Sequence, residues 1–207
     1  MATEIVVISG GLGTPSTSRM LGDQLGQAAA AALANDGVEA EVSVVELRDV
    51  AVDIATTMVA GYAPPKLAEV IRHVERADAL VAVSPVFTAS VSGLFKSFLD
   101  VLDPTALDGK PVVLAATGGS ARHSMVIDYV MRPIFSYLRA NAMPTGVFAA
   151  PEDWGGDTGG GQLGERAARA AAELVRALGG VRASAERPDP MESLPFEQLL
   201  ANIQPGA

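Results

Sequence analysis

The 207-residue sequence contains no cysteine and only two histidines. Without cysteine, the chain has no disulfide bond, no thiolate metal ligand and no cysteine nucleophile. Two histidines are also too few for a metal site built mainly from imidazole groups. These absences exclude thiol chemistry and weigh against a catalytic metal centre.

Basic residues are fewer than acidic ones, with 15 Lys and Arg against 24 Asp and Glu, so the formal net charge is −9. This balance argues against a protein that wraps nucleic acid or coats an anionic membrane, because both depend on positive charge. No segment reaches the roughly 18 continuous apolar residues of a membrane helix. The N-terminal segment carries Glu4 where a signal peptide has basic residues. We therefore expect a cytoplasmic protein that binds neither nucleic acid nor membranes.

Apolar residues make up 49% of the chain and charged residues only 19%, which is ample material for a buried core. Disordered chains are poor in apolar residues, so most of this chain is expected to fold. The composition changes after residue 180, where the sequence becomes polar and punctuated by prolines. We expect one domain over residues 1–180 and a polar C-terminal tail over residues 181–207.

Short apolar runs alternate with helical stretches along the expected domain. Three runs are apolar throughout, as is typical of parallel strands covered on both faces, and two weaker ones are expected near the sheet edges. The predicted strands span residues 4–9, 42–47, 79–84, 111–117 and 143–149. The predicted helices span residues 17–35, 65–76, 91–102, 124–140 and 162–178. This alternation predicts an α/β fold, a flavodoxin-like doubly wound five-stranded parallel sheet of order 2-1-3-4-5 with helices on both faces.

The segment after the first strand, residues 9–19, reads SGGLGTPSTSR. Its glycines let the backbone approach a ligand closely. Three hydroxyl residues, Ser16, Thr17 and Ser18, then stand at the start of the first helix, where free N–H groups and the helix dipole favour an anion. The pattern predicts a phosphate site. The alternative is a tight turn followed by an N-capping serine.

Two nucleotide-binding motifs are not matched by this loop. The P-loop motif requires Gly-Lys followed by Ser or Thr, and the sequence has none. The dinucleotide motif G-x-G-x-x-G is met at Gly11 and Gly13, but its third position is Ser16, and the nearest suitable acid, Glu46, is too distant. A terminal monophosphate is therefore favoured over a dinucleotide.

Two further loops are expected at the same edge of the sheet, after the third and fourth strands. The first contains Pro85 and Phe87, which can form a flat wall for a planar ring, and the alternative is that Phe87 packs in the core. The second contains Gly118 and Gly119, whose backbone can face a ring edge, and the alternative is a plain turn.

The segments SGGLGTPSTS, SPVFTASVSGLFKSFLDVL and ATGGSARHS together resemble the NAD(P)H-dependent FMN reductases of the flavodoxin-like superfamily. The similarity runs in order from about Ile5 to Gly155 and is greatest to the flavin reductases of two-component monooxygenase systems. It implies a set of phosphate-binding residues, namely Ser9, Ser16, Thr17 and Ser18. It likewise implies a set lining the isoalloxazine ring, namely Pro85, Val86, Phe87 and Thr88, with Gly118 and Gly119 at its other edge.

The sequence departs from the family pattern at three of these positions. Thr88 stands where some relatives carry a lysine. Thr17 stands where a basic residue often neutralises the phosphate, and Arg19 is the candidate to supply that charge instead. Phe87 replaces the commoner tyrosine. Trp154, in a glycine-rich stretch, is expected either to cover the flavin of a neighbouring subunit or to anchor its own loop.

The resemblance implies an enzyme that transfers hydride from NADPH or NADH to FMN and supplies reduced flavin or electrons to an acceptor. A flavin-dependent monooxygenase is the implied partner, and a homodimer or homotetramer the implied assembly. Because the cofactor carries the chemistry, we assign no catalytic acid or base. The alternatives are a flavodoxin-type electron carrier, a regulatory α/β domain without flavin, or a quinone, azo or chromate reductase that uses the same FMN site.

Overall fold

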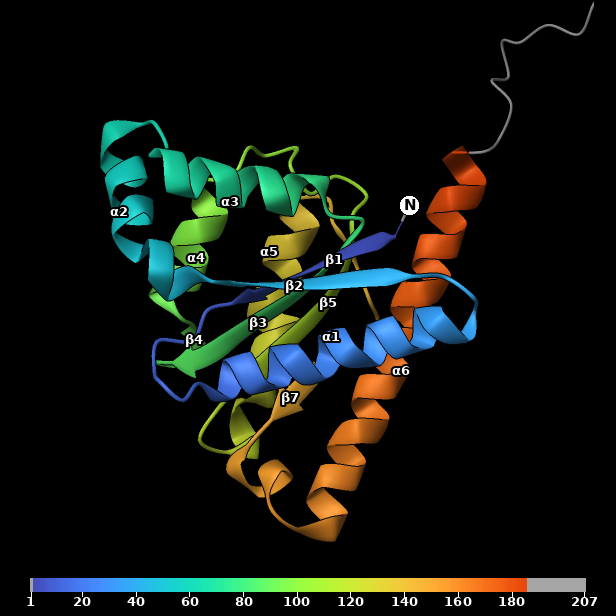
Figure 1. Cartoon of the computed structure of the whole chain (residues 1–207). Coiled ribbons are helices and arrows are strands. Elements are labelled where there is room, and N and C mark those ends of the chain that lie inside the picture. Colours follow the sequence, from blue (N-terminus) through green and yellow to red (C-terminus); the bar gives the residue numbers. More distant parts are fainter. Residues whose placement is uncertain (1, 186–207) are drawn as a thin grey trace, which may run out of the picture.

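The computed structural model describes residues 2–185, without the side chains of residues 156–160 and 180–185, and shows a parallel sheet between two layers of helices (Figure 1). The strands are β1 (Thr3–Ser9), β2 (Ala40–Glu46), β3 (Ala79–Phe87), β4 (Ser90–Val91), β5 (Pro111–Thr117), β6 (Asn141–Ala142) and β7 (Val147–Ala149). The longer helices are α1 (Thr17–Asn35), α2 (Ala51–Ala60), α3 (Pro65–Arg76), α4 (Gly93–Asp100), α5 (Arg132–Tyr137) and α6 (Gly156–Ala185). The short ones are the 3-10 helices η1 (Leu47–Val50), η2 (Ala121–Met125) and η4 (Pro151–Trp154) and the π-helix η3 (Ile127–Met131).

The sheet has the order β2-β1-β3-β5-β6, and β7 also pairs with β5. All of these pairs are parallel, so the chain crosses over a face of the sheet between neighbouring strands. The predicted order was 2-1-3-4-5. The observed order is the same when β5 is counted as the fourth strand and β6 and β7 together as the fifth, because the short β4 pairs only with β3. The predicted fold class is therefore confirmed.

The fifth strand differs from the prediction of one continuous strand over residues 143–149. The structure has two short pieces, β6 and β7, on either side of Met143–Gly146. Pro144 has no N–H group to donate to the ladder. Gly146 lies against the helical layer, since a Cβ there would stand 2.5 Å from Cγ2 of Ile127. Backbone geometry, rather than hydrophobicity, interrupts this strand.

The helices over residues 17–35 and 65–76 agree with the prediction. α4 is two residues shorter at each end than the predicted helix over residues 91–102, and the predicted helices over residues 124–140 and 162–178 differ more. The predicted helix over residues 124–140 is divided into η2, η3 and α5. Pro133 at the start of α5 has no N–H group to donate, and it lies where the π-helix changes to an α-helix. α2 is not among the predicted helices, because its only buried residue is Ile54 and its hydrophobic pattern is therefore weak.

Helix α6 is longer than predicted and continues to Ala185, into the segment expected to be a tail. Residues 186–207 lie outside the described residues, so the division of the chain at residue 180 stays a prediction. Within residues 2–185, no helix is both long enough and apolar enough to cross a membrane.

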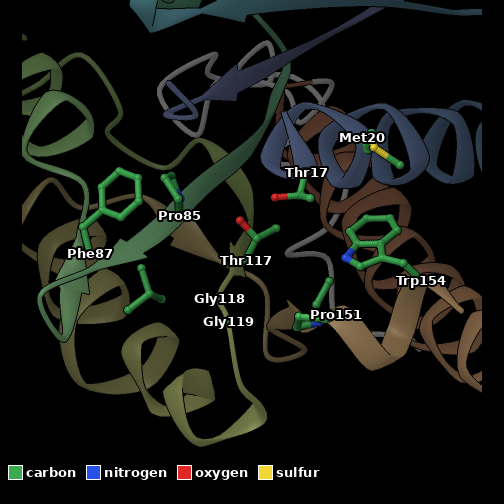
Figure 2. Close-up of a pocket in the computed structure, with 11 residues that line it drawn as sticks. Thr17, Met20, Pro85, Phe87, Thr117, Gly118, Gly119, Pro151 and Trp154 are labelled. Carbon is green, nitrogen blue, oxygen red and sulfur yellow. The ribbon is translucent and has the colours of Figure 1, made fainter. Parts of the chain in front are cut away.

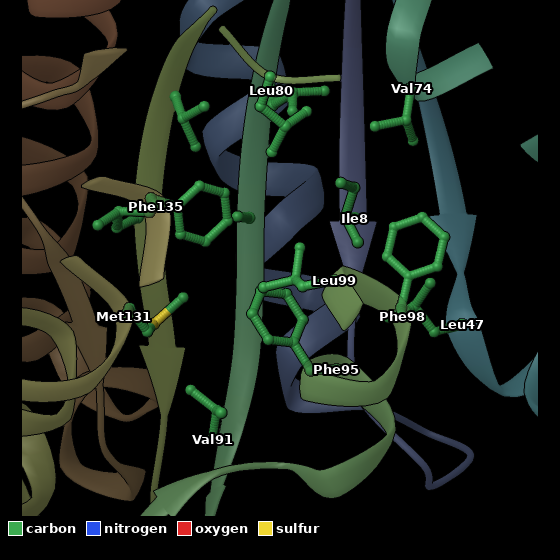
Figure 3. Close-up of a cluster of buried hydrophobic side chains, with 14 of the residues drawn as sticks. Ile8, Leu47, Val74, Leu80, Val91, Phe95, Phe98, Leu99, Met131 and Phe135 are labelled. Atoms are coloured by element: carbon green, nitrogen blue, oxygen red, sulfur yellow. The ribbon is translucent and has the colours of Figure 1, made fainter. Parts of the chain in front are cut away.

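The sheet separates two hydrophobic clusters. Alternate residues of β1 point to opposite faces, so Ile5 and Val7 pack with α1 and α6, whereas Val6 and Ile8 pack with α3, α4 and α5. Figure 3 shows the second cluster, in which Phe95 and its neighbours on α4 face the strands. This two-sided packing fixes the carboxyl ends of β1, β3 and β5 at one edge of the sheet.

Candidate functional site

A cavity of about 510 Å³ opens at the carboxyl ends of β3, β5 and β7, beside the first turn of α1. From β1 the chain continues to β2 on one side of the sheet, and later to β3 and β5 on the other side. Open α/β sheets bind their ligands beside such a change of direction. The lining residues are Thr17, Met20, Pro85, Val86, Phe87, Thr117, Gly118, Gly119, Ala149, Pro151 and Trp154. In Figure 2, Pro85 and Phe87 lie on one side, Met20 and Trp154 on the other, and Thr17 and Thr117 between them. The cavity has apolar walls and two hydroxyls, a composition common among cofactor pockets.

The predicted ring-binding segment lies at the end of β3, not in a loop. Pro85, Val86 and Phe87 belong to the strand, and β3 turns back through Thr88 and Ala89 into β4. Thr88 and Ala89 both have positive φ angles, 48° and 60°, as the turn requires. Phe87 lines the cavity and is 45% exposed, so the alternative of a core position is wrong. Thr88 is not among the lining residues.

The two glycines after β5 also line the cavity. The N–H group of Gly118 donates to the carbonyl of Ala149 at 3.1 Å, which joins the ends of β5 and β7. A Cβ at Gly118 would lie 2.9 Å from Cζ of Phe148, so this position has no room for a side chain. Gly119 has open space around it. The backbone at Gly119 is therefore accessible from the cavity.

The glycine-rich loop passes closely over the start of α1. Ser16 is the N-cap of the helix, and its hydroxyl accepts a hydrogen bond from the N–H of Arg19 at 3.2 Å. A Cβ at Gly11 would stand only 2.2 Å from that hydroxyl oxygen. The N–H groups of Gly11, Leu12, Gly13 and Thr14 have no hydrogen-bond acceptor among the described residues. The loop thus combines a fixed close turn with free donors, and Thr17 connects it to the cavity.

Two predicted phosphate residues, Ser9 and Ser18, are buried. The Ser18 hydroxyl is 2.8 Å from that of Thr117, a hydrogen bond that joins α1 to the end of β5. The Ser9 hydroxyl has no hydrogen-bond partner within residues 2–185. Strand alternation directs Ser9 to the same face as Ile5 and Val7, the face that α1 covers. A buried hydroxyl without a partner is unfavourable in the folded protein, and a phosphate oxygen in this loop would satisfy it.

Arg19 does not face a free anion site. Its Nε is 2.8 Å from Asp23, and its Nη1 is 2.9 Å from Glu46. The hydrogen bond with Asp23 raises the pKa of the Arg19 guanidinium above its usual value, although partial burial opposes this rise. The lining residues carry no charge. Arg19, the residue expected to replace the missing basic residue, is thus already paired with two carboxylates.

Four lining residues were not among those predicted from the sequence, namely Met20, Thr117, Ala149 and Pro151. Met20 lies three residues after Thr17 on α1, a helical spacing that places both on one side. The others depend on how β5 and β7 end beside each other, which no local pattern reveals. Trp154 lines the cavity of its own chain and packs against the α1 cluster, so its ring helps to anchor the segment that follows β7.

Comparison with known proteins accords with this geometry. The family model described as NADPH-dependent FMN reductase matches residues 3–155. The chain belongs to this family. The resemblance inferred from the sequence motifs is therefore confirmed, over nearly the same range of residues.

Relatives of this family cover most of the chain. The FMN reductase (NADPH) of Pseudomonas aeruginosa is 37% identical over 151 residues, which are 73% of this chain and 78% of the relative. The NADH-dependent FMN reductase SfnF of Pseudomonas putida is 37% identical over 148 residues, 72% of this chain and 77% of the relative.

Solved structures agree with the same family fold. An oxidoreductase from Corynebacterium diphtheriae has a TM-score of 0.83 and 45% identity, covering 86% of this chain and 98% of that one. The NADH:FMN oxidoreductase EmoB has a TM-score of 0.70 and 28% identity, covering 82% and 89%. A flavodoxin-type WrbA-like protein from Agrobacterium tumefaciens, at 13% identity, a TM-score of 0.56 and coverage of 86% and 98%, shares the fold.

Proposed function

We propose that this member of the FMN reductase family transfers hydride from NADPH or NADH to FMN bound at the carboxyl edge of its sheet. The carrying observation is an uncharged, partly aromatic cavity lined by Thr17, the first residue of α1, together with the preceding loop, whose N–H groups have no acceptor among the described residues. An isoalloxazine ring needs the first feature, and a phosphate needs the second. The names of the relatives in both Pseudomonas species support the same activity.

The residues present fit FMN at both ends. The orphaned Ser9 hydroxyl and the closed turn at Gly11 suit a phosphate, and Ser16, Thr17 and Ser18 are the further candidates to hold it. Phe87 and Pro85 suit one side of a flat ring, and the backbone at Gly118 and Gly119 suits its edge. When bound, FMN supplies the hydride-accepting chemistry. The protein's own part is to orient the ring and to leave one face open to nicotinamide, as the 45% exposure of Phe87 allows.

The test is steady-state oxidation of NADPH and of NADH, measured with and without added FMN. The proposal predicts turnover that depends on FMN. A flavodoxin-type carrier would bind FMN without sustained nicotinamide oxidation. A regulatory domain would show neither turnover nor a flavin-induced rise in melting temperature. Either of these results would overturn the proposal.

The acceptor of the reduced flavin is the next part of the proposal. We infer a flavin-dependent monooxygenase that takes up reduced FMN, because the sequence motifs resemble those of the flavin reductases of two-component monooxygenase systems. Oxygen uptake by such a partner, dependent on this protein and on NADPH or NADH, is the expected result. Quinone, azo or chromate reduction at the same site would instead appear as faster turnover with those acceptors.

A homodimer or homotetramer is part of the same proposal. Tyr129 and Tyr137, on η3 and α5, are 73% and 81% exposed, and Tyr137 lines a groove at the surface. A groove of about 510 Å³ lies between α4 and α5, and it contains the Lys96–Asp100 ion pair. Sedimentation at micromolar concentration is expected to give the mass of at least two chains, and a monomer would contradict this.

A further inference from the structure

The exposed tip of the glycine-rich loop is held by an arginine from a distant part of the chain. Nη1 of Arg48 donates to the carbonyl of Gly13 at 2.6 Å and also to the hydroxyl of Thr14. Nη2 of the same guanidinium forms an ion pair with Oε2 of Glu46 at 2.8 Å, a contact that does not have the geometry of a hydrogen bond. Arg48 therefore joins two separate groups through two different nitrogen atoms.

The fold explains why Arg48 reaches this loop. Glu46 ends β2 directly beside Ser9, which ends β1, in the parallel register of the two strands. η1 begins at the next residue, so Arg48 starts out close to the first residues of the loop. Glu46 is largely buried, with 14% of its side chain exposed, and its second oxygen accepts from Arg19 on α1 at 2.9 Å. One carboxylate thus connects the tip of the loop, through Arg48, with the first turn of α1, through Arg19.

We propose that Arg48 is a positioning residue for flavin phosphate, which acts by holding the Gly13–Thr14 tip so that the loop's free N–H groups converge on one anion. This inference rests on the proposed function, since it takes the loop to hold the FMN phosphate. The N–H groups from Gly11 to Thr14 have no acceptor among residues 2–185. Without a fixed tip, the loop would have to be ordered at the moment of binding, which reduces affinity.

A lysine would not replace this arginine. The guanidinium binds the loop and Glu46 through separate nitrogens in a planar fork, whereas an ammonium group is a single point charge. Arg48→Lys keeps the charge and loses the bridge. The two variants Arg48→Ala and Arg48→Lys therefore separate a positioning effect from direct charge attraction to the phosphate.

The experiment compares the affinities of the wild type and the variants for FMN and for riboflavin, which lacks the phosphate, by quenching of flavin fluorescence. Arg72→Ala is the matched control, because Arg72 is an exposed arginine on α3 and its loss changes the net charge equally. Riboflavin binding and the melting temperature report whether each variant is folded.

The expected result is that Arg48→Ala weakens FMN binding by about tenfold, as for the loss of a charge-assisted hydrogen bond, and changes riboflavin binding by less than about twofold. Arg48→Lys should recover less than half of this loss on a logarithmic scale, and Arg72→Ala should change neither affinity. Full recovery by Arg48→Lys, an equal loss for FMN and riboflavin, or unchanged FMN affinity in Arg48→Ala would each overturn the role of Arg48 alone. Failure of the wild type to bind any flavin would overturn the proposed function itself.

Discussion

Replacement of Phe87 by alanine distinguishes a residue that contributes to ligand binding from one that contributes to the stability of the hydrophobic core. In the structure, Phe87 lies at the end of β3, lines the cavity and is 45% exposed. It is not part of either hydrophobic cluster, whereas its neighbour Val86 packs against one of them. Its ring is thus expected to contribute to ligand binding more than to folding.

The magnitude follows from the exposed fraction. Complete burial of a phenylalanine side chain stabilises a protein by roughly 1.5–3 kcal/mol, and Phe87 is buried over about half of its surface. Phe87→Ala should therefore lower the free energy of unfolding of the apoprotein by only about 1 kcal/mol, equivalent to a fall of about 2–4 °C in melting temperature. Loss of an aromatic contact with the flavin ring should weaken FMN binding by about 0.5–1.5 kcal/mol, or roughly two- to tenfold.

Phe98→Ala is the matched control, because Phe98 on α4 is fully buried and does not line the cavity. It should lower the free energy of unfolding by about 3–5 kcal/mol, with little direct effect on flavin affinity in the folded protein. Phe87→Tyr should be benign, since a hydroxyl at the exposed rim can reach water. Thermal melts of the apoproteins and FMN titrations decide the matter. A large loss of apoprotein stability in Phe87→Ala with unchanged FMN affinity would refute the reasoning.

Three further predictions concern single positions. Gly11→Ala would place a Cβ 2.2 Å from the Ser16 hydroxyl, so the FMN affinity measured by titration should fall more than about tenfold. The control is Gly164→Ala on α6, where a Cβ meets open space and the FMN affinity should not change. Ser9→Ala removes a buried hydroxyl without a partner, so the apoprotein should melt at the same or a higher temperature while FMN affinity falls; a lower melting temperature would show that the hydroxyl is satisfied. Hydrogen bonds from the side chain and, secondly, the backbone of Thr105 lower the pKa of Asp103. The stability that this carboxylate contributes is therefore present above the usual aspartate pKa and is lost as the pH falls through the lower pKa of the folded state. An NMR titration midpoint at or above the usual aspartate pKa would contradict this.

The parts of the fold that the sequence predicts well are those with a strong local signal. Residues 111–116 are apolar and lie in the sheet interior, as expected for a parallel strand that is covered on both faces. α2 was missed because only Ile54 faces the core, and the helix therefore lacks an amphipathic pattern. Pro144 and Gly146 weaken the fifth strand in the sequence, but its division into β6 and β7 is visible only in the structure.

Some residues of the site are likewise indicated by the sequence, whereas others are revealed only by the structure. The glycines, the hydroxyls at the start of α1 and the segment Pro85–Phe87 have types and positions that already indicate a ligand. Neither the residue type nor the sequence position of Arg48 indicates a ligand. Arg48 follows an edge strand and reaches the loop only because β1 and β2 lie side by side. The pairing of Arg19 with Asp23 and Glu46 was also hidden, since an arginine at the start of a helix looks available until its neighbours are placed.

The central claim is that hydride passes from a nicotinamide to FMN held at the carboxyl edge of the sheet. The most direct measurement is anaerobic stopped-flow mixing of NADPH, and separately NADH, with the protein and FMN, followed by the visible absorbance of the flavin. The account predicts rapid bleaching of the flavin with at least one of the two donors, and slower bleaching in Phe87→Ala than in the wild type. Bleaching no faster than in a mixture without protein, although FMN is bound, would contradict it.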